Sequence, residues 1–186
     1  MKLQWKSKLQ STVMTGVFAA LLAVLSQISI PLPTGIPVTL QTFAVALCGF
    51  ALGPGLGAAA VGVYLALGAV GVPVFAGFSG GIGSFVGMTG GYLWAFLPMA
   101  FLCGLGGPAE KQGPWPAPWG FGGSWRCATC AALSSLPLFR RCPPGMPSCW
   151  PQPPYLLKDA ASLVAAYLAA AAILRSLEKA RLVTLV

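Results

Sequence analysis

The segment Tyr155–Leu174 reads YLLKDAASLVAAYLAAAAIL, and it decides the class of fold. Its length and its apolar side chains are typical of a helix that crosses a bilayer, which takes roughly 20 mainly apolar residues. Lys158 and Asp159 stand in the first turn of this helix. Ionisable side chains near hydrocarbon cost free energy and are by default candidates for function. The sequence therefore predicts a membrane-spanning helix with a functional pair at one end.

The rest of the chain is similarly apolar. Of the 186 residues 56% are hydrophobic, and no charged residue lies between Lys8 and Glu110. A soluble fold presents a charged surface to water, so this composition predicts an all-α, polytopic membrane protein, with residues 1–186 forming a single integral membrane domain. The net charge of +8 does not indicate nucleic-acid binding, because the basic residues gather at the two ends and in one central stretch, without interleaved aromatic residues.

Apolar runs bounded by proline and glycine predict five spanning helices. They are Thr12–Ile30, Pro37–Leu52, Leu56–Val74, Gly91–Leu105 and Leu156–Leu174. The first is expected to be a retained helix, because no convincing small-x-small cleavage site follows it. The short sequence GPGLG (Gly53–Gly57) is expected to form a tight turn between the second and third helices.

The distribution of basic residues predicts the orientation. Lysines precede the first span, and lysine and arginine follow the last one, so the positive-inside rule places both termini in the cytoplasm. Two cytoplasmic termini require an even number of crossings. A sixth helix is therefore expected between Gly106 and Pro154.

Residues 107–153 differ from the rest of the chain. They contain most of its prolines, four of its six tryptophans and four of its six cysteines, in no periodic pattern. Proline and glycine at this density oppose a spanning helix. Out-of-frame translation is the preferred interpretation, because GC-rich coding DNA read in the wrong frame tends to yield these residue types. A proline-rich cytoplasmic loop is a second interpretation.

A zinc site is the third interpretation of residues 107–153. Its ligands would be Cys127, Cys130, Cys142 and Cys149. The spacing of the second pair is wrong for a zinc ribbon, and the chain has no histidine. No bound metal is therefore expected.

The orientation also predicts which segments meet on the outer side. Ser29–Phe43 and Val72–Phe96 are long connections on that side, and the last helix begins there. The two connections carry hydroxyl, amide, aromatic and glycine-rich backbone groups but no charged side chain. Such a lining suits a small, mostly apolar solute rather than an ion.

Two motifs on these segments, PVTLQTF (Pro37–Phe43) and GMTGGYL (Gly87–Leu93), resemble the BioY family. Its members are the substrate-binding membrane subunits of energy-coupling-factor (ECF) biotin transporters. The resemblance covers about Thr12–Leu105 and resumes near Tyr155, although Met88 stands where the family usually has proline. It implies six helices, capture of biotin from the outer side, and the cell membrane of a prokaryote as the location. The implied partners are a transmembrane coupling subunit and cytoplasmic ATPase subunits.

Two other functions stay open beside biotin capture. The chain would bind a different small vitamin if its site departs from that of the family. It would be a nonfunctional remnant if residues 107–153 are a damaged centre, because that segment does not resemble the family.

The resemblance suggests how the ionisable pair would act. Lys158 would neutralise the valerate carboxylate of biotin, and Asp159, about 100° further around the helix, would accept hydrogen bonds from the ureido ring. The alternative is that Asp159 caps the helix and Lys158 extends to water. The remaining predicted substrate-binding residues are Thr39, Gln41, Ser79, Gly80 and Tyr92. Hydroxyl, amide, glycine and aromatic groups of this kind also serve in helix contacts, turns and membrane anchors.

Ala19 and Ala23 form a small-xxx-small pair on the first helix, a spacing that permits close helix packing. The related transporters use such a face to dock the coupling subunit, so the resemblance assigns these two alanines to partner docking. The sequence shows no histidine, no paired acids and no phosphate-binding loop, so neither enzymatic activity nor a cofactor is expected. ATP hydrolysis would come from the partners.

Overall fold

The computed structural model describes residues 3–5, 7–30, 38–86, 90–106, 153–179 and 183–185. Its helices are α1 (Lys8–Gln27), α2 (Gln41–Val70), α3 (Gly83–Val86), α4 (Gly90–Leu105) and α6 (Pro153–Lys179), with a 3₁₀ turn η1 (Ala76–Phe78). Its strands are β1 (Leu3–Trp5), β2 (Ser29–Ile30), β3 (Val38–Thr39) and β4 (Val183–Leu185). Apart from these short strands and the connections between elements, the described part is helical, which confirms the predicted all-α class.

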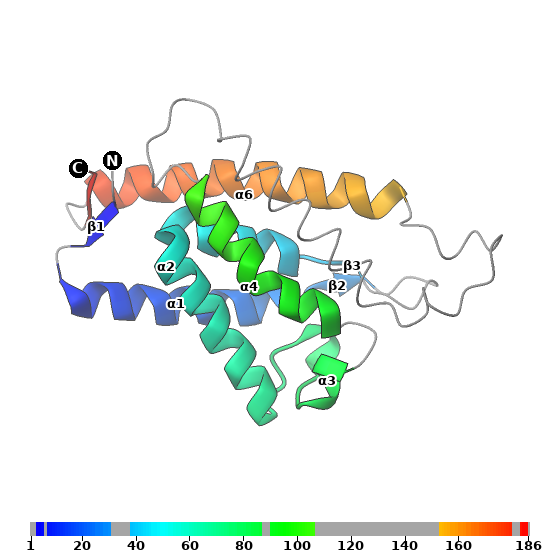
Figure 1. The fold of residues 1–186 in the computed structure, drawn as a ribbon. Coiled ribbons are helices and arrows are strands. Elements are labelled where there is room, and N and C mark those ends of the chain that lie inside the picture. The colour runs from blue at the N-terminus through cyan, green and yellow to red at the C-terminus, as the bar shows by residue number, and fades with distance from the viewer. Residues whose placement is uncertain are drawn as a thin grey trace.

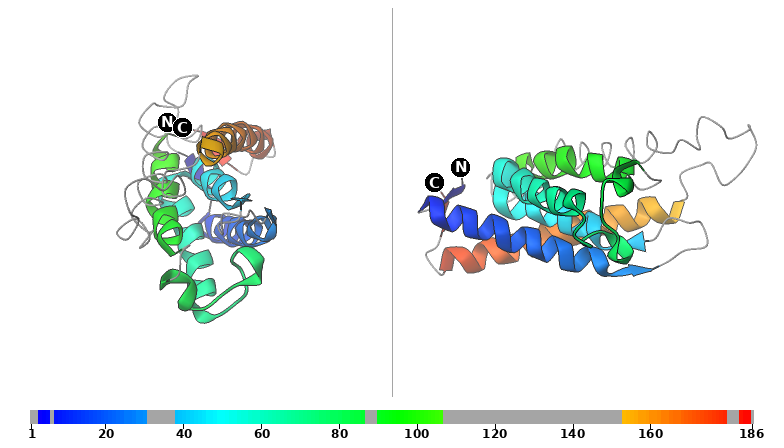
Figure 2. Two further views of the ribbon diagram at one scale, coloured as in Figure 1. Left: turned by 90° about the vertical axis from the view of Figure 1, so that its right-hand side faces the viewer. Right: turned by 90° about the horizontal axis from the view of Figure 1, so that it is seen from below.

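The helices form an elongated bundle. α1 and α6 run along its length, and the first half of α2 lies between them when the bundle is viewed end-on (Figures 1 and 2). β1 and β4 pair in an antiparallel ladder, so the two termini lie side by side at one end, which we call the terminal end (Figure 1). β2 and β3 pair at the opposite end, which we call the loop end. Termini that share one end agree with an even number of crossings, while the side that faces the cytoplasm stays a prediction.

A sharp bend divides α2 into two helical halves. Gly53 adopts φ 82° and ψ 178°, and it is the single non-helical residue inside α2. Residues with a Cβ atom rarely adopt positive φ, so glycine suits this position. The following Pro54 has no N–H to donate, so the helical hydrogen bonding is interrupted here and the chain can change direction abruptly. The predicted second and third spans are therefore confirmed as helices, the two halves of α2, and their separate crossings of a membrane stay a prediction. The predicted five-residue turn between them shrinks to one residue.

The outer ends of the predicted spans also shift. β2 pairs with β3, and this ladder takes up residues that the sequence assigned to the end of the first span and the start of the second. α2 ends at Val70 rather than Val74, because Gly71 adopts the left-handed conformation at φ 108° and its N–H bonds back to the Gly68 carbonyl. Capping and strand pairing, rather than hydropathy, set these boundaries.

Three described helices are long and apolar enough to cross a membrane. They are α1, α2 and residues 161–179 of α6, and α4 contains a shorter apolar helix, Leu93–Leu105. α4 ends against the bend in α2, where a Cβ atom on Gly104 would lie 2.3 Å from the Pro54 nitrogen. α6, by contrast, begins at the loop end (Figure 1). The sixth helix, the zinc alternative and the frame interpretation all fall on residues 107–152, outside the described residues, so they stay predictions.

The interior is almost entirely apolar. α1, α2, α4 and α6 each contribute at least one fully buried large side chain, respectively Leu22, Phe50, Met99 and Leu163. Among the described residues, the buried side chains classed as polar are Ser26, Gln41 and Thr42. All three lie where α1 ends and α2 begins, so the polar interior of the described chain gathers at the loop end.

Candidate functional site

The predicted substrate-binding residues gather at the loop end. Thr39 is in β3 and Gln41 begins α2, while Ser79 and Gly80 follow η1. Tyr92 belongs to the first turn of α4. Lys158 and Asp159 are the sixth and seventh residues of α6, which starts at the same end (Figure 1). They therefore lie in its second turn rather than in the first turn predicted from the sequence, because the helix begins two residues earlier, at Pro153. The side chains of Tyr92, Lys158 and Asp159 lie outside the described part of the structure, so their roles stay predictions.

The connection between α2 and α3, residues 71–82, folds back onto the helices, and we call it the docked loop. Its Val74 carbonyl oxygen accepts hydrogen bonds from Ser26 Oγ on α1 and from Tyr64 Oη on α2, the latter at 3.3 Å. Gln41 Nε2 in turn donates to Tyr64 Oη at 2.7 Å. Ser26, Gln41 and Tyr64 are all buried. Buried polar side chains of two helices therefore hold the loop backbone in place.

A second set of hydrogen bonds joins the docked loop to the last residue of α1. Gln27 Nε2 donates to the Pro73 carbonyl oxygen at 3.2 Å, and Gln27 Oε1 accepts from the Phe78 N–H at 3.1 Å. Its one amide group thus binds two points of the loop. Phe78 has φ 55°, and it is the only described residue other than glycine with positive φ.

Gly68 provides the platform for the loop on α2. A Cβ atom there would lie 2.0 Å from Cζ of Phe75, whose ring is 3% exposed. The Gly68 carbonyl also accepts the Gly81 N–H at 2.7 Å. Only glycine leaves room for the Phe75 ring at this position, so the loop is anchored by shape as well as by hydrogen bonds.

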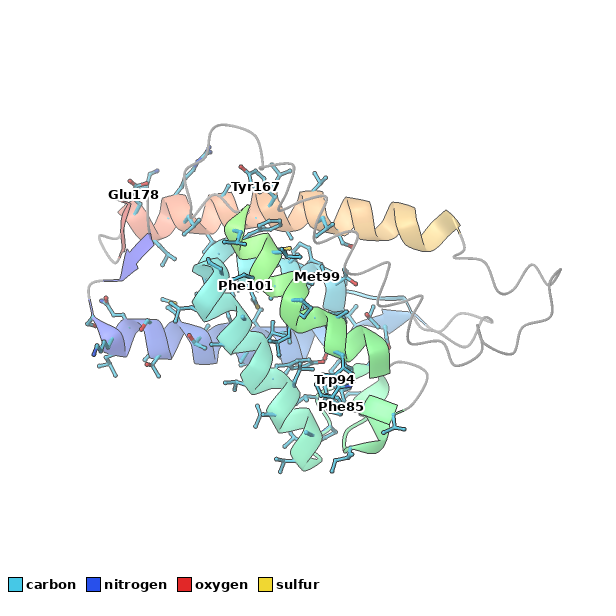
Figure 3. The ribbon with its side chains drawn as sticks, in the orientation of Figure 1. Phe85, Trp94, Met99, Phe101, Tyr167 and Glu178 are labelled. Atoms are coloured by element: carbon cyan, nitrogen blue, oxygen red, sulfur yellow. The ribbon has the colours of Figure 1, made fainter. Side chains whose placement is uncertain are left out.

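Aromatic rings connect this anchor to the surface. Tyr64, Phe75, Phe85 and Trp94 follow one another edge-to-face, with ring centroids 5.5, 5.6 and 5.8 Å apart. Phe85 and Trp94 lie together near α3 at the loop end (Figure 3). Trp94 is 66% exposed, whereas Tyr64 is fully buried. Edge-to-face pairs add packing energy, so the row ties α2, the docked loop, α3 and α4 into one unit.

Three of the predicted residues have contacts of their own in this unit. Gln41 is bound to Tyr64. Ser79 Oγ donates to the Ala76 carbonyl at 2.9 Å within the loop. A Cβ atom on Gly80 would lie 2.5 Å from the Val72 carbonyl oxygen, so that turn requires glycine. These contacts support a structural role for each residue, and direct contact with a substrate stays a prediction.

Ser26, Gln27 and Tyr64 are not among the residues predicted from the sequence. Ser26 and Gln27 are adjacent polar residues at the end of an apolar run, and Tyr64 interrupts a run of small and aliphatic residues. Polar side chains in otherwise apolar spanning helices usually bond to another part of the protein. That rule would have singled them out but would not have named their partners.

The predicted docking residues on α1 do not face outward. Ala19 is 2% exposed, and Ala23 is half-buried and packs against the core. The exposed small residues on α1 are Gly16 and Ala20, and a Cβ atom on Gly16 would meet no other atom within 4 Å. Docking itself stays a prediction. The small residues that a partner could reach are Gly16 and Ala20, on the face of α1 that points away from the core.

Comparison with known proteins identifies the family. The model of the BioY family matches residues 1–179. The chain belongs to the BioY family. The resemblance seen in the sequence motifs is therefore confirmed.

Curated BioY proteins are similar to part of the chain. The probable biotin transporter BioY of Pyrococcus horikoshii is 48% identical over 99 residues, which cover 53% of this chain and 60% of that protein. The biotin transporter BioY of Thermotoga maritima is 47% identical over 104 residues, covering 56% of this chain and 60% of that protein. In these matches the chain spans about 60% of the length of its relatives.

A crystal structure of the S-component for biotin from an ECF-type ABC transporter has the same fold. The two structures align with a TM-score of 0.62 and 24% sequence identity, over 92% of each chain. This likeness confirms the S-component architecture of the BioY chain as a fold.

Proposed function

We propose that this BioY chain captures biotin at the loop end as the substrate-binding subunit of an ECF transporter. The family match over residues 1–179 is the observation that carries this proposal. The relatives' names, which specify biotin transport, and the fold of a biotin S-component support it. The docked loop adds support, because it gives the loop end an ordered surface of backbone and aromatic groups.

The distribution of charge supports Lys158 as the partner of the biotin carboxylate. Apart from Lys158 and Asp159, the charged side chains in the described part of the chain belong to the first turn of α1 and the end of α6, at the terminal end. They are Lys8, Arg175, Glu178 and Lys179, and Figure 3 shows the position of Glu178. Lys158 is therefore the cation that the described chain supplies at the loop end.

The other predicted residues have roles at the same two ends of the bundle. Asp159 accepts hydrogen bonds from the ureido ring, and Thr39, Gln41, Ser79, Gly80 and Tyr92 surround it with neutral polar groups and an aromatic face. The termini lie in the cytoplasm, where the ATPase subunits act, and the exposed face of α1 meets the coupling subunit within the bilayer.

Retention of labelled biotin on the purified full-length chain tests the proposal. We expect saturable retention that excess unlabelled biotin abolishes and that excess thiamine or riboflavin leaves unchanged. Retention that another vitamin displaces would favour the sister-subunit alternative. A folded chain that retains neither labelled biotin nor labelled thiamine or riboflavin would favour the nonfunctional remnant.

We further propose that residues 107–153 arise from a shifted reading frame. The nucleotide sequence around these codons tests this directly. An alternative frame should encode an apolar run of about 20 residues with few charges, as a spanning helix requires. Stop codons or proline-rich sequence in both other frames would contradict the proposal.

A further inference from the structure

The side-chain amide of Gln27 binds the docked loop at two backbone points. It donates to Pro73 and accepts from Phe78, at 3.2 and 3.1 Å. Pro73 and Phe78 bracket the segment that contains Val74, the residue held by Ser26 and Tyr64. Gln27 therefore binds the two ends of this segment from α1, while the buried hydroxyl groups of Ser26 and Tyr64 bind the Val74 carbonyl oxygen within it.

The conformation of Phe78 shows why such a closure is needed. Its φ of 55° lies in the left-handed region, which costs free energy for a bulky residue and persists only when the surroundings impose it. Its ring is 72% exposed, so packing around the ring does not impose this conformation. The Phe78 N–H, in contrast, is fixed by Gln27 Oε1. The Phe75 N–H donates to the Ser79 carbonyl at 3.0 Å and closes the backbone turn around Phe78. The hydrogen bond from the Phe78 N–H to Gln27 adds a side-chain restraint from α1.

We propose that Gln27 is a positioning residue that holds the docked loop in its ligand-ready conformation. A loop that is already ordered binds its ligand more tightly, because the ordering cost is not met during binding. This inference rests on the proposed capture of biotin at the loop end. It assigns Gln27 no contact with biotin, since both ends of its amide are engaged by the loop backbone.

The first experiment measures backbone hydrogen exchange in the full-length chain without ligand. Gln27→Leu keeps the side chain similar in size but removes both hydrogen bonds. We expect faster exchange of the Phe78 N–H and of its neighbours in residues 73–79. Gln10→Leu is the matched control, because Gln10 lies near the opposite end of the same helix, and it should leave loop exchange unchanged. Unchanged loop exchange in Gln27→Leu would overturn the inference.

The second experiment measures biotin affinity in the same variants. Gln27→Leu should weaken biotin about 10-fold, a factor in the range for losing neutral hydrogen bonds. Gln10→Leu should bind like the wild type. Faster loop exchange with unaltered affinity would show that Gln27 holds the loop without positioning it for biotin, and would also overturn the inference. A wild-type chain that retains no biotin would instead refute the proposed function, while the exchange experiment still reports on the loop.

A third variant separates positioning from general damage. In Gln27→Glu the ionised carboxylate can accept from the Phe78 N–H but cannot donate to Pro73, whereas the protonated form can do both. No other charged residue lies between Lys8 and Glu110, so the introduced group would be the only carboxyl group on α1 and the docked loop. The ratio of variant to wild-type Kd should fall toward one as the pH is lowered, and the ratio for Gln27→Leu should stay constant. A pH-independent defect in Gln27→Glu would contradict the positioning role.

Discussion

The two ends of the bundle are held together by different forces. At the bend in α2, where α4 ends, glycines bring helix backbones into direct contact. A Cβ atom on Gly49 would lie 2.4 Å from the Ala100 carbonyl oxygen, and one on Gly57 would lie 2.8 Å from the Cys48 carbonyl oxygen. At the loop end, side chains of α1 and α2 bind the docked loop through hydrogen bonds. A methyl group added at a close backbone contact forces the helices apart, whereas removing one side-chain hydrogen bond from the docked loop leaves its other bonds in place. The bend is therefore expected to govern folding, and the loop end to govern ligand binding.

The largest expected effect comes from filling the glycine contact. Gly49→Ala should destabilise the protein by about 3 kcal/mol or more, the upper range for overpacking, because the new methyl group meets backbone atoms that cannot rotate away. Gly55→Ala is the control, since a Cβ atom there meets nothing within 4 Å, and alanine is favoured over glycine in a helix by up to about 1 kcal/mol. Thermal unfolding in detergent measures both. Equal melting temperatures for the two variants would contradict the proposed role of the bend.

The next largest effect is on ligand affinity alone. Lys158→Met keeps the apolar stem but removes the ammonium group, so it should weaken biotin by about 1.5–3 kcal/mol, as expected for a hydrogen bond to a charged group. Biotin amide lacks the carboxylate and should lose much less. Calorimetric titration of both ligands against wild type and variant gives this difference, which a general folding defect cannot imitate. Equal affinities of wild type and variant for both ligands would show that Lys158 extends to water.

Removing one hydroxyl group from the loop end should have a smaller effect. Tyr64→Phe deletes the group that accepts from Gln41 and donates to Val74, at an expected cost of about 1–2 kcal/mol in stability. Faster hydrogen exchange in the docked loop should accompany it. Tyr167→Phe is the matched control, because that ring packs on Phe50 away from the loop and should leave loop exchange unchanged. Identical loop exchange in both variants would remove Tyr64 from the network.

Substitutions on the exposed face of α1 should not change biotin affinity at all. Ala20→Leu should lower recovery of the coupling subunit by blocking close helix approach, because Ala20 is exposed. Ala19→Leu should instead lower thermal stability, because Ala19 is buried within the chain. Co-purification and thermal unfolding of both variants measure the contrast. Loss of the coupling subunit from a stable Ala19→Leu variant, with full recovery by Ala20→Leu, would restore the docking face predicted from the sequence.

Hydropathy and breaker residues were enough to predict the four long described helices, although not their ends or the short α3. Apolar runs of sufficient length, interrupted at Gly53–Pro54, account for α1, α2, α4 and α6, whereas the end of α2 at Gly71 was not predicted. The burial of Ala19 could not be predicted in the same way. In a membrane helix the lipid-facing side is as apolar as the protein interior, so the hydrophobic pattern does not distinguish the two faces.

The site was only partly predictable for a different reason. A motif brought Thr39 and Gln41 to attention, and the glycine-rich connection Val72–Phe96 did the same for Ser79. The structure places all three at the loop end. The contacts that organise this end join residues far apart in sequence, such as Ser26 with Val74 and Gln27 with Phe78. No local pattern encodes such pairings, because they depend on how the helices pack.

Hydrogen exchange of the full-length chain with and without biotin compares the two ends in a single experiment. If biotin binds at the loop end, it should slow exchange in the docked loop, residues 71–82, and in the first turns of α6. Exchange around the bend in α2, residues 46–57, should not change, since that contact is already closed by backbone packing. Exchange that biotin leaves unaltered at the loop end, or slows only around the bend, would contradict capture of biotin at the loop end.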